Sequence, residues 1–532
     1  MNILTNRYGE RVYILIGLSF FLLISCILFI FPLVISIDSI YGFLAYKGTR
    51  QTGIFNVLQE VSQQNVATVR KLFVAWWSPG QWMAPAFLQL LFGCRLGIAS
   101  IIITILSSGL GIYGFYKLYK YFGFSQPVII TSLLILLLSD SFYNSFIIYQ
   151  GGEVLSFGIF PWFLLFVVKL NKFSWKTSVF FLAFFLLCFV AKTTLVVYCS
   201  IIVLYKIAEK NLSLLKGRLN WKAEYNVILC LGLPWLLGCV AIDLFYLQKG
   251  LHITFIKEFS PELSDILVPF SSPLSSILSG QTIILRIQKM ITGDIRDMYI
   301  SLSLYFILGV IIVIGIYRAS KQQSISSSYL RFLIVLYIAI SFFFITGYLF
   351  SANIDKNVRH FKLLGFLFIP VFVALFRNIN MLKGIVFVFV IYSVSDFIYL
   401  KNKWAKNRYV SINYFYRNYY NLEDIDGIDI QTYRKLISLD QSTPLQEQAR
   451  PIVFFFEGNA DIAIDIKHPA VFETEQAKLG AVAYKGKDAD VFIIVSKKTL
   501  GSVPQFLKLL LPDYREIRKI DETDHYLFFK SE

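Results

Sequence analysis

The chain has 532 residues, of which 56% are hydrophobic, 17% aromatic and only 16% charged. A soluble protein of this size cannot be solvated by so few charges, and several apolar runs approach the ~20 residues that a helix needs to cross a bilayer. The sequence therefore indicates a polytopic membrane protein, and the net charge of +16 is not read as nucleic-acid binding because many basic residues lie in short loops between apolar runs.

Eleven apolar runs are predicted to span the membrane, and the first is too long for the core of a cleaved signal peptide. Lys192 separates two of them, since an ammonium group facing lipid in the middle of a bilayer is costly. The predicted spans are residues 13–36, 94–116, 127–147, 154–168, 177–191, 193–208, 225–246, 298–317, 329–350, 361–376 and 382–400.

Lysine and arginine are concentrated in the short loops on one side of these spans, which contain almost no acids. Because such loops stay in the cytoplasm, the N-terminus is predicted to be cytoplasmic. The abundance of Ile, Phe, Tyr and Lys hints at an AT-rich bacterial genome, so the expected location is a bacterial inner (plasma) membrane. The segments expected outside the cytoplasm are then 37–93, 140–153, 247–297, 351–360 and the tail from about 401.

Residues 1–400 are predicted to form an all-α polytopic membrane domain of about 11 transmembrane helices, with a large first outer loop at 37–93. Residues 401–532 are predicted to form a small extracytoplasmic α/β domain. Its predicted elements are the strands "IVFFF" (452–456), "VFIIV" (491–495) and "YLFF" (526–529) and a helix over 503–511.

The sequence indicates neither a cofactor nor a metal site. The predicted cytoplasmic side has no domain and no phosphate-binding glycine loop, and the four histidines show no metal-ligand spacing. All six cysteines lie in apolar runs, which predicts buried thiols rather than disulfides or metal ligands. The large polar segments all face the side where soluble nucleotides are scarce. We therefore expect a substrate delivered through the membrane, such as a polyprenyl-phosphate-linked sugar.

The stretch "IDSIYGFLAYKG" follows the first predicted span and places Asp38 and Tyr41 at the membrane surface. A carboxylate held there can take the proton from an acceptor hydroxyl, but Asp38 can equally cap an interfacial helix. The stretch "WWSPGQWMAPAFLQLLFG" (76–93) contributes Trp77 and Gln81, either to a substrate groove or to an ordinary aromatic belt at the interface.

A second acid stands at the mouth of the fourth predicted span, in "QGGEVLSFG" (150–158). Glu153 is interpreted either as a second acid of the same site or as a residue that complements the dipole of the helix it begins. Gln150 is assigned to the substrate groove.

Two basic residues are predicted on the same outer side of the membrane: Lys192 in "FVAKTTLVV" and Arg359 in "DKNVRHFKLL" (355–364). A departing lipid phosphate needs fixed positive charge, and an arginine can bind it through two hydrogen bonds. His360 is assigned to the substrate groove beside Arg359. The alternatives are that Lys192 extends to the interface and that Asp355 pairs with Lys356 or Arg359.

These features, in this order, resemble the GT-C superfamily of membrane glycosyltransferases, and most of all the branch that contains protein O-mannosyltransferases and the bacterial lipid A aminoarabinose transferase. The resemblance covers about residues 10–400. It includes "IDSIYGFLAYKG", "MAPAFLQLLFG" followed by Arg95, the acid at the start of span four, "AKTT" and "VRHF". Two positions differ from the family pattern: Ser39 stands where Glu is frequent, and Gln81 where Lys or His is common.

The resemblance implies a role for each charged residue. Asp38 would be the catalytic base, Glu153 a second acidic residue of the site, and Lys192 and Arg359 contacts of the donor phosphate. The expected partners are a polyprenyl-phosphate-linked sugar, an extracytoplasmic acceptor and the lipid bilayer, with no nucleic acid.

The leading hypothesis is an inverting glycosyltransferase that moves a sugar from a polyprenyl-phosphate donor to an extracytoplasmic glycan, lipid or protein. A transporter or flippase for lipid-linked glycans would instead predict charges deep within spans and repeat symmetry between halves, and neither is evident. A glycan polymerase predicts an Arg-rich large loop, whereas loop 247–297 contains only Arg286 and Arg296.

Overall fold

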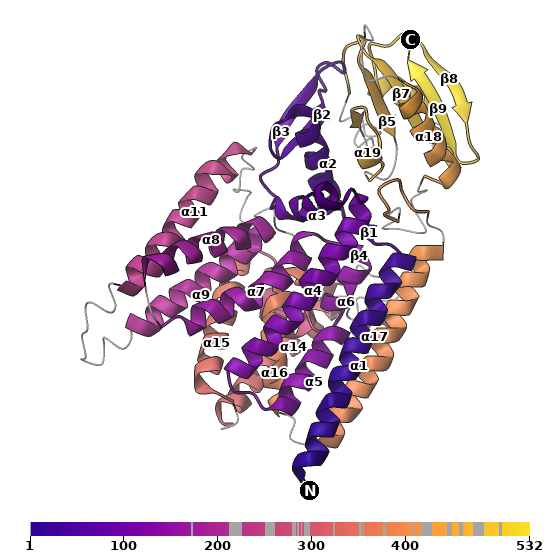
Figure 1. Cartoon of the computed structure of the whole chain (residues 1–532). Helices are drawn as coiled ribbons and strands as arrows, with labels where there is room; N and C mark the ends of the chain where they lie inside the picture. Colours follow the sequence, from indigo (N-terminus) through magenta and orange to yellow (C-terminus); the bar gives the residue numbers. More distant parts are fainter. Residues whose placement is uncertain are drawn as a thin grey trace.

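The computed structural model places a helical bundle below a C-terminal sheet, with the N-terminus at the far end of the bundle from that sheet (Figure 1). The end of the bundle nearest the sheet is called the upper end. The residues that the structure describes are 2–171, 174–211, 226–250, 261–278, 284, 287–288, 290–291, 298–322, 325–350, 354, 356–375, 379–406, 409–416, 428–443, 450–456, 461–471, 483–498 and 503–531.

Each of the eleven predicted spans coincides with a helix or a helix pair. The helices are α1 (Asn2–Ile30), α4 (Leu96–Tyr121), α5 (Gln126–Leu138) with α6 (Asp140–Tyr143), α7 (Gly152–Lys169), α8 (Trp175–Ala191), α9 (Thr193–Asn211), η3 (Ile228–Gly232) with α11 (Leu233–Phe245), α14 (Met298–Ser320), α15 (Ser327–Leu349), η5 (Val358–Phe361) with α16 (Lys362–Leu375) and α17 (Ile379–Lys406). Lys192 has an extended backbone between α8 and α9, as the split of that region predicted.

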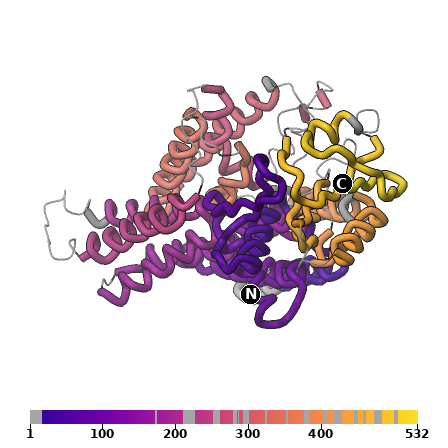
Figure 2. The backbone as a smooth tube through the Cα atoms, turned by 90° about the horizontal axis from the view of Figure 1, so that it is seen from above, coloured from indigo at the N-terminus to yellow at the C-terminus, as the bar shows by residue number. Residues whose placement is uncertain are grey.

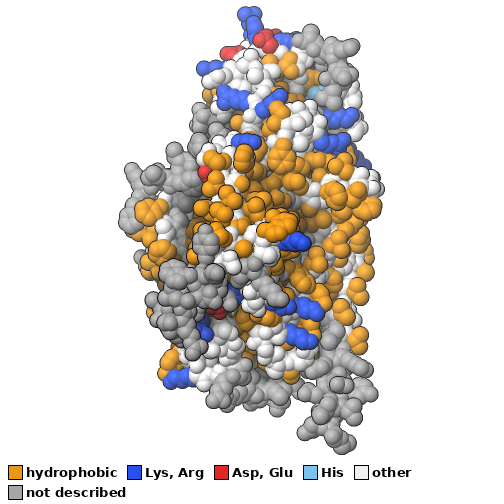
Figure 3. Space-filling model, turned by 60° about the vertical axis from the view of Figure 1, so that its left-hand side comes forward, with side chains coloured by type: hydrophobic (Ala, Val, Ile, Leu, Met, Phe, Trp, Pro, Cys, Tyr) orange, Lys and Arg blue, Asp and Glu red, His pale blue; other side chains and the backbone are white. Residues whose placement is uncertain are grey.

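The predicted count of eleven spans is not confirmed when length and composition are both required. Among the described residues, six helices are long and apolar enough to cross a membrane, and the pair of α5 and α6, bent by 59°, would be a seventh. In an apolar window of 18 residues within Ile228–Lys249, and in one within Ile300–Ser320, only 22% of the residues are buried, so most of their side chains point outward. On the face in Figure 3, hydrophobic side chains cover the middle of the molecule. This surface is that of a multi-pass membrane protein.

Small residues let the helices approach one another closely. A Cβ at Gly111 of α4 would lie 2.3 Å from the Phe157 ring of α7, and one at Gly114 would lie 2.6 Å from Pro161. Close packing through glycine is typical of helices in membranes, where apolar burial alone does not drive association. The contact of α4 with α7 fixes the helix whose first turn carries Glu153.

The upper end carries short elements between the first two long helices of the bundle. These are β1 (Val34–Ile35), α2 (Ile37–Thr52), the hairpin of β2 (Val57–Val61) and β3 (Val69–Phe73), and α3 (Gly80–Phe92). Strand β1 pairs in parallel with β4 (Ile148–Tyr149), the strand that precedes α7. This pairing brings the start of α2 beside the start of α7, although they are far apart in the sequence.

Segment 247–297 contains a helix that the sequence analysis did not predict. Helix α12 (Leu263–Ser275) includes Pro269 and Pro273, and its N-terminus has a capping box formed by Glu262 and Asp265. Lys356 contacts both acids, at 2.7 Å from Glu262 and 2.5 Å from Asp265. Asp355, the predicted partner of Lys356, lies outside the described residues.

The C-terminal residues form a five-stranded mixed sheet in the order β6-β5-β7-β9-β8. Its predicted strands and helix are present as β5, β7, β9 and α21. The sheet lies toward one side of the bundle in the view from above (Figure 2). The elements are α18 (Ile430–Ser442), β5 (Ile452–Phe456), α19 (Ile462–Asp465), β6 (Ala470–Val471), β7 (Asp490–Ser496), α21 (Val503–Leu510), β8 (Ile517–Glu522) and β9 (Tyr526–Ser531).

Backbone hydrogen bonds join the segment before β7 to the turn of the hairpin. The Val66 N–H donates to the Lys485 carbonyl at 2.8 Å, and the Lys485 N–H donates to the Gln63 carbonyl at 2.9 Å. Nearer the bundle, the Tyr416 N–H donates to the Leu33 carbonyl at 3.0 Å. The C-terminal residues therefore rest on the elements that follow α1.

Candidate active site

Asp38 lies in the first turn of α2, at the upper end of the bundle, and forms an ion pair with Arg359. The Asp38 Oδ2 to Arg359 Nη1 distance is 3.0 Å, and the two side chains are 27% and 28% exposed. The helix cap is Ser36, whose hydroxyl accepts a hydrogen bond from the Ser39 N–H at 3.3 Å. The alternative in which Asp38 caps the helix is therefore wrong, and its carboxylate can be reached from solvent.

Glu153 lies in the first turn of α7, is 6% exposed, and contacts two lysines. Its Oε1 pairs with the Lys192 ammonium group, and its Oε2 lies 3.2 Å from Lys362 Nζ. A buried charge is tolerated when it is paired, and here one carboxylate faces two cations. Glu153 is thus more than a helix N-terminal acid, and Lys192, at 18% side-chain exposure, points to this acid rather than extending freely to the interface.

Two of the three cationic partners of the acids come from one short segment. Arg359 lies in η5 and Lys362 begins α16, three residues later. The Asn357 side chain accepts a hydrogen bond from the Arg359 N–H at 2.9 Å, which fixes the start of this turn. This segment therefore supplies a cationic partner both to Asp38 in α2 and to Glu153 in α7.

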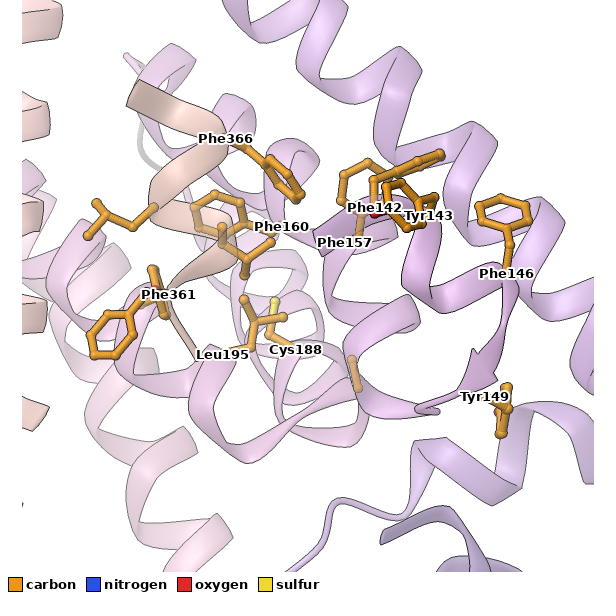
Figure 4. Close-up of a cluster of buried hydrophobic side chains, with 14 of the residues drawn as sticks. Phe142, Tyr143, Phe146, Tyr149, Phe157, Phe160, Cys188, Leu195, Phe361 and Phe366 are labelled. Carbon is orange, nitrogen blue, oxygen red and sulfur yellow. The ribbon is translucent and has the colours of Figure 1, made fainter. Parts of the chain in front are cut away.

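Aromatic packing holds this segment against α7. The Phe157 and Phe366 rings meet edge to face, with centroids 5.4 Å apart, and Figure 4 shows Phe160 and Phe361 in the same cluster. Edge-to-face ring pairs add ~0.5–1.5 kcal/mol to the burial of their surfaces. These ring contacts therefore hold the segment that carries Arg359 and Lys362 beside α7.

Gln81 fixes the position of α2 relative to α3 and to the turn before α7. Its side-chain Nε2 donates to the Asp38 carbonyl at 3.1 Å, and its own carbonyl accepts from the Tyr149 hydroxyl at 2.7 Å. A Cβ at Gly42 would lie 2.7 Å from the Gln81 side chain, and one at Gly151, where φ is +37°, would lie 2.4 Å from it. Gln81 is 5% exposed, so the structure places it in this packing rather than on an open groove wall.

The other predicted groove residues lie in different surroundings. The Tyr41 and Trp77 rings stack, with centroids 4.9 Å apart, and both line a cavity of about 380 Å³. The His360 ring stacks on Phe344 at 5.5 Å, and both ring nitrogens are buried without a hydrogen-bond partner in the structure. The Gln150 carbonyl accepts from the Glu153 N–H at 3.0 Å.

Lys362 belongs to the site, although the sequence did not predict it there. Its side chain is 6% exposed and lies 3.2 Å from Glu153. The available signal was the spacing of three residues from Arg359, which places two cations on neighbouring turns.

No group of three or more His, Cys, Asp or Glu residues that could hold a metal ion is found within the part of the chain that the structure describes. The cluster consists of two acids, two lysines and an arginine at the upper end of the bundle. It can bind an anionic group through its cations and can accept a proton at Asp38.

The fold and this cluster define a multi-pass membrane protein with paired charges at one end of its helices. No protein-family model matches the sequence, and no curated protein matches it. Among solved structures, the chain is similar to ArnT from Cupriavidus metallidurans bound to undecaprenyl phosphate, with 11% identity over 97% of this chain and 98% of that chain and a TM-score of 0.43. It is also similar to the apo state of the same protein, with 10% identity over 98% of both chains and a TM-score of 0.40.

At this identity and TM-score the likeness is a distant one. The roles of individual residues rest on their contacts within this chain.

Proposed function

We propose that this protein is an inverting glycosyltransferase that moves a sugar from a polyprenyl-phosphate donor to an acceptor outside the cytoplasm. The observation that carries the proposal is the pairing of Asp38 with Arg359 and of Glu153 with Lys192 and Lys362 at one end of the bundle. ArnT, to which the chain is similar, was solved with undecaprenyl phosphate, which accords with a lipid-phosphate substrate.

The reaction is a single displacement at the anomeric carbon of the donor sugar. The acceptor hydroxyl oxygen forms the new bond, the bond from the anomeric carbon to the phosphate oxygen breaks, and its electron pair leaves with the phosphate. Asp38 takes the proton of the acceptor hydroxyl as general base. Arg359 and Lys192 stabilise the negative charge that develops on the leaving phosphate.

Because Asp38 pairs with Arg359, binding of the donor also affects the proposed base. A phosphate that binds Arg359 competes with the Asp38 carboxylate for the same guanidinium group. Donor binding thereby releases Asp38 to contact the acceptor hydroxyl. Glu153 is a positioning residue, because it contacts Lys192 and Lys362 and holds them beside this site.

The test uses the purified full-length protein in detergent with a labelled polyprenyl-phosphate sugar and an envelope extract as acceptor source. We expect Asp38→Asn to lower transfer at least 100-fold, which is the lower range of the contribution of a general base. The matched control is Asp243→Asn, the same chemical change at an exposed acid of α11.

Transfer that survives Asp38→Asn at the wild-type rate removes Asp38 as the base. Movement of the labelled lipid across liposome membranes without sugar transfer would instead support the transporter hypothesis.

A further inference from the structure

A cavity of about 380 Å³ lies between the upper end of the bundle and the C-terminal sheet. Its walls come from α2, from the β2–β3 hairpin, from Trp76 and Trp77, and from Ala463, residues 469–471 and Tyr484 of the C-terminal region. Its volume lies within the range of about 300–1,000 Å³ that is usual for ligand sites. A molecule in this cavity would contact two parts of the chain that are separated by hundreds of residues.

The cavity runs along α2 from the turn that carries the proposed base. Tyr41, Leu44 and Gln51 line it, and Asp38 lies three residues before Tyr41 on the same side of the helix. At 1.5 Å per residue, the helical rise from Asp38 to Tyr41 is ~5 Å. A group bound at the Tyr41 end can therefore place a hydroxyl near Asp38.

The wall nearest Asp38 is aromatic. Tyr41 and Trp77 stack with an interplanar angle of 19°, and Trp76 meets Trp77 at 63° with centroids 5.4 Å apart. All three rings are half-buried, so part of each is accessible. Flat aromatic faces of this kind bind the C–H face of a pyranose ring, while the ring hydroxyls point outward to polar groups.

The other walls combine apolar and polar side chains. Leu58, Leu72 and Val471 line the cavity, and so do the polar residues Lys47, Gln51, Gln59 and Glu60. A lipid acyl chain would remove the Gln59 amide and the Glu60 carboxylate from water without supplying hydrogen bonds, which is costly. The hydroxyls of a glycan supply them.

The opposite wall is held in place by Lys47. Its ammonium group donates to the Ala463 carbonyl at 3.0 Å and to the His468 carbonyl at 3.3 Å, and Gln51 donates to the Lys467 carbonyl at 3.0 Å. The C-terminal wall is therefore attached to the same helix that carries Asp38.

We propose that this cavity is the acceptor site and that the acceptor is a glycan, with a sugar ring stacked on Trp77 and Trp76. The inference rests on the proposed function and goes further, because it selects the glycan among the possible glycan, lipid and protein acceptors.

The experiment measures glycan binding by the full-length protein in nanodiscs, with no donor present. The probes are immobilised tetrasaccharides of glucose, galactose, mannose, rhamnose and N-acetylglucosamine. We expect the wild type to bind at least one of them and Trp77→Ala to bind it at least tenfold more weakly. Trp175→Ala is the matched control, because this tryptophan is 71% exposed at the start of α8, away from the cavity.

A second variant keeps the test decisive if Trp77→Ala fails to fold. Ala470→Trp fills the cavity from the C-terminal wall and leaves the aromatic stack intact, and we expect the same tenfold loss. Absence of wild-type binding to every tetrasaccharide overturns the inference, as does wild-type binding by both cavity variants. Because no donor is present, a protein that binds glycan but transfers no sugar overturns only the proposed function.

Discussion

Glu153 is a buried carboxylate whose two oxygens face Lys192 and Lys362. Replacing it with glutamine leaves two ammonium groups in a mostly buried site without their counter-charge. Removing one member of a buried ion pair typically costs ~3–5 kcal/mol. We therefore expect Glu153→Gln to lower the free energy of unfolding by about this amount, measured by thermal unfolding of the purified protein.

Asp38→Asn is the comparison for this prediction, since the Asp38 side chain is 27% exposed and its pair with Arg359 is partly hydrated. We expect it to cost about 1 kcal/mol or less. The double variant Glu153→Gln with Lys362→Met should recover part of the loss, because it removes one of the two unpaired cations. Equal stability of Glu153→Gln and the wild type would show that the lysines do not depend on this carboxylate.

The acids and cations of the site were predictable one by one, but their pairing was not. Asp38, Glu153, Lys192 and Arg359 each stand at the mouth of an apolar run, which is visible in the sequence. Which acid meets which cation depends on the β1–β4 pairing and on the packing of α16 against α7, which no local pattern records. The same dependence explains why Lys362 was missed.

At the scale of elements, α2 and α3 approach closely at Gly42. A methyl group there would lie 2.7 Å from the Gln81 side chain, which in turn donates to the Asp38 carbonyl. Overpacking of a tight contact usually costs ~1–3 kcal/mol. We expect Gly42→Ala to destabilise the protein by this amount and to reduce sugar transfer, as measured by thermal unfolding and by the transfer assay.

Gly109→Ala provides the control for this variant. Its Cβ would lie 3.8 Å from the Phe21 ring, an ordinary contact distance. A Gly42→Ala protein as stable and as active as Gly109→Ala would show that the contact of α2 with α3 can relax without moving Asp38.

Lys47 joins α2 to the C-terminal region and provides a test by pH. Burial lowers the pKa of Lys47 to about 8, although Asp440 and Asp465 favour its charged form. Its ordinary value is 10.5, so between pH 8 and pH 10.5 the unfolded chain binds more protons than the folded one. Stability from this residue therefore rises with pH in that interval, by at most ~1.4 kcal/mol per pH unit.

The measurement is the difference in unfolding free energy between the wild type and Lys47→Met from pH 7 to pH 10. We expect the difference to be constant below pH 8 and to shift in favour of the wild type above it. Lys508→Met, at an exposed lysine of α21, is the matched control. A flat difference up to pH 10 would contradict the burial of the Lys47 ammonium group.

The elements that the sequence predicted best are those with a strong local pattern. Strand β5 is apolar at every position and fully buried, and its predicted bounds agree with the observed ones. Strand β8 (Ile517–Glu522) was missed because its sequence, "IRKIDE", is charged and lies at the sheet edge. Helix α12 was missed because two prolines argue against a helix in the absence of its tertiary contacts.

At the scale of the whole molecule, the N-terminus and the C-terminal sheet lie at opposite ends of the bundle (Figure 1). The excess of lysine and arginine in the short loops predicts that the N-terminal end is cytoplasmic. The proposed reaction requires this orientation, because the donor phosphate, the charged cluster and the cavity must all be accessible from outside the cytoplasm.

Single cysteines introduced at exposed lysines test the orientation in intact cells with a membrane-impermeant maleimide. Lys508→Cys in α21 should be labelled without permeabilisation, because the C-terminal sheet lies at the upper end. Lys176→Cys in α8 and Lys321→Cys after α14 should be labelled only after the membrane is opened, because both lie in predicted cytoplasmic loops. The unmodified protein corrects for its six native cysteines, of which Cys188 and Cys199 are buried. The reverse labelling pattern would place the charged cluster in the cytoplasm and contradict transfer to an external acceptor.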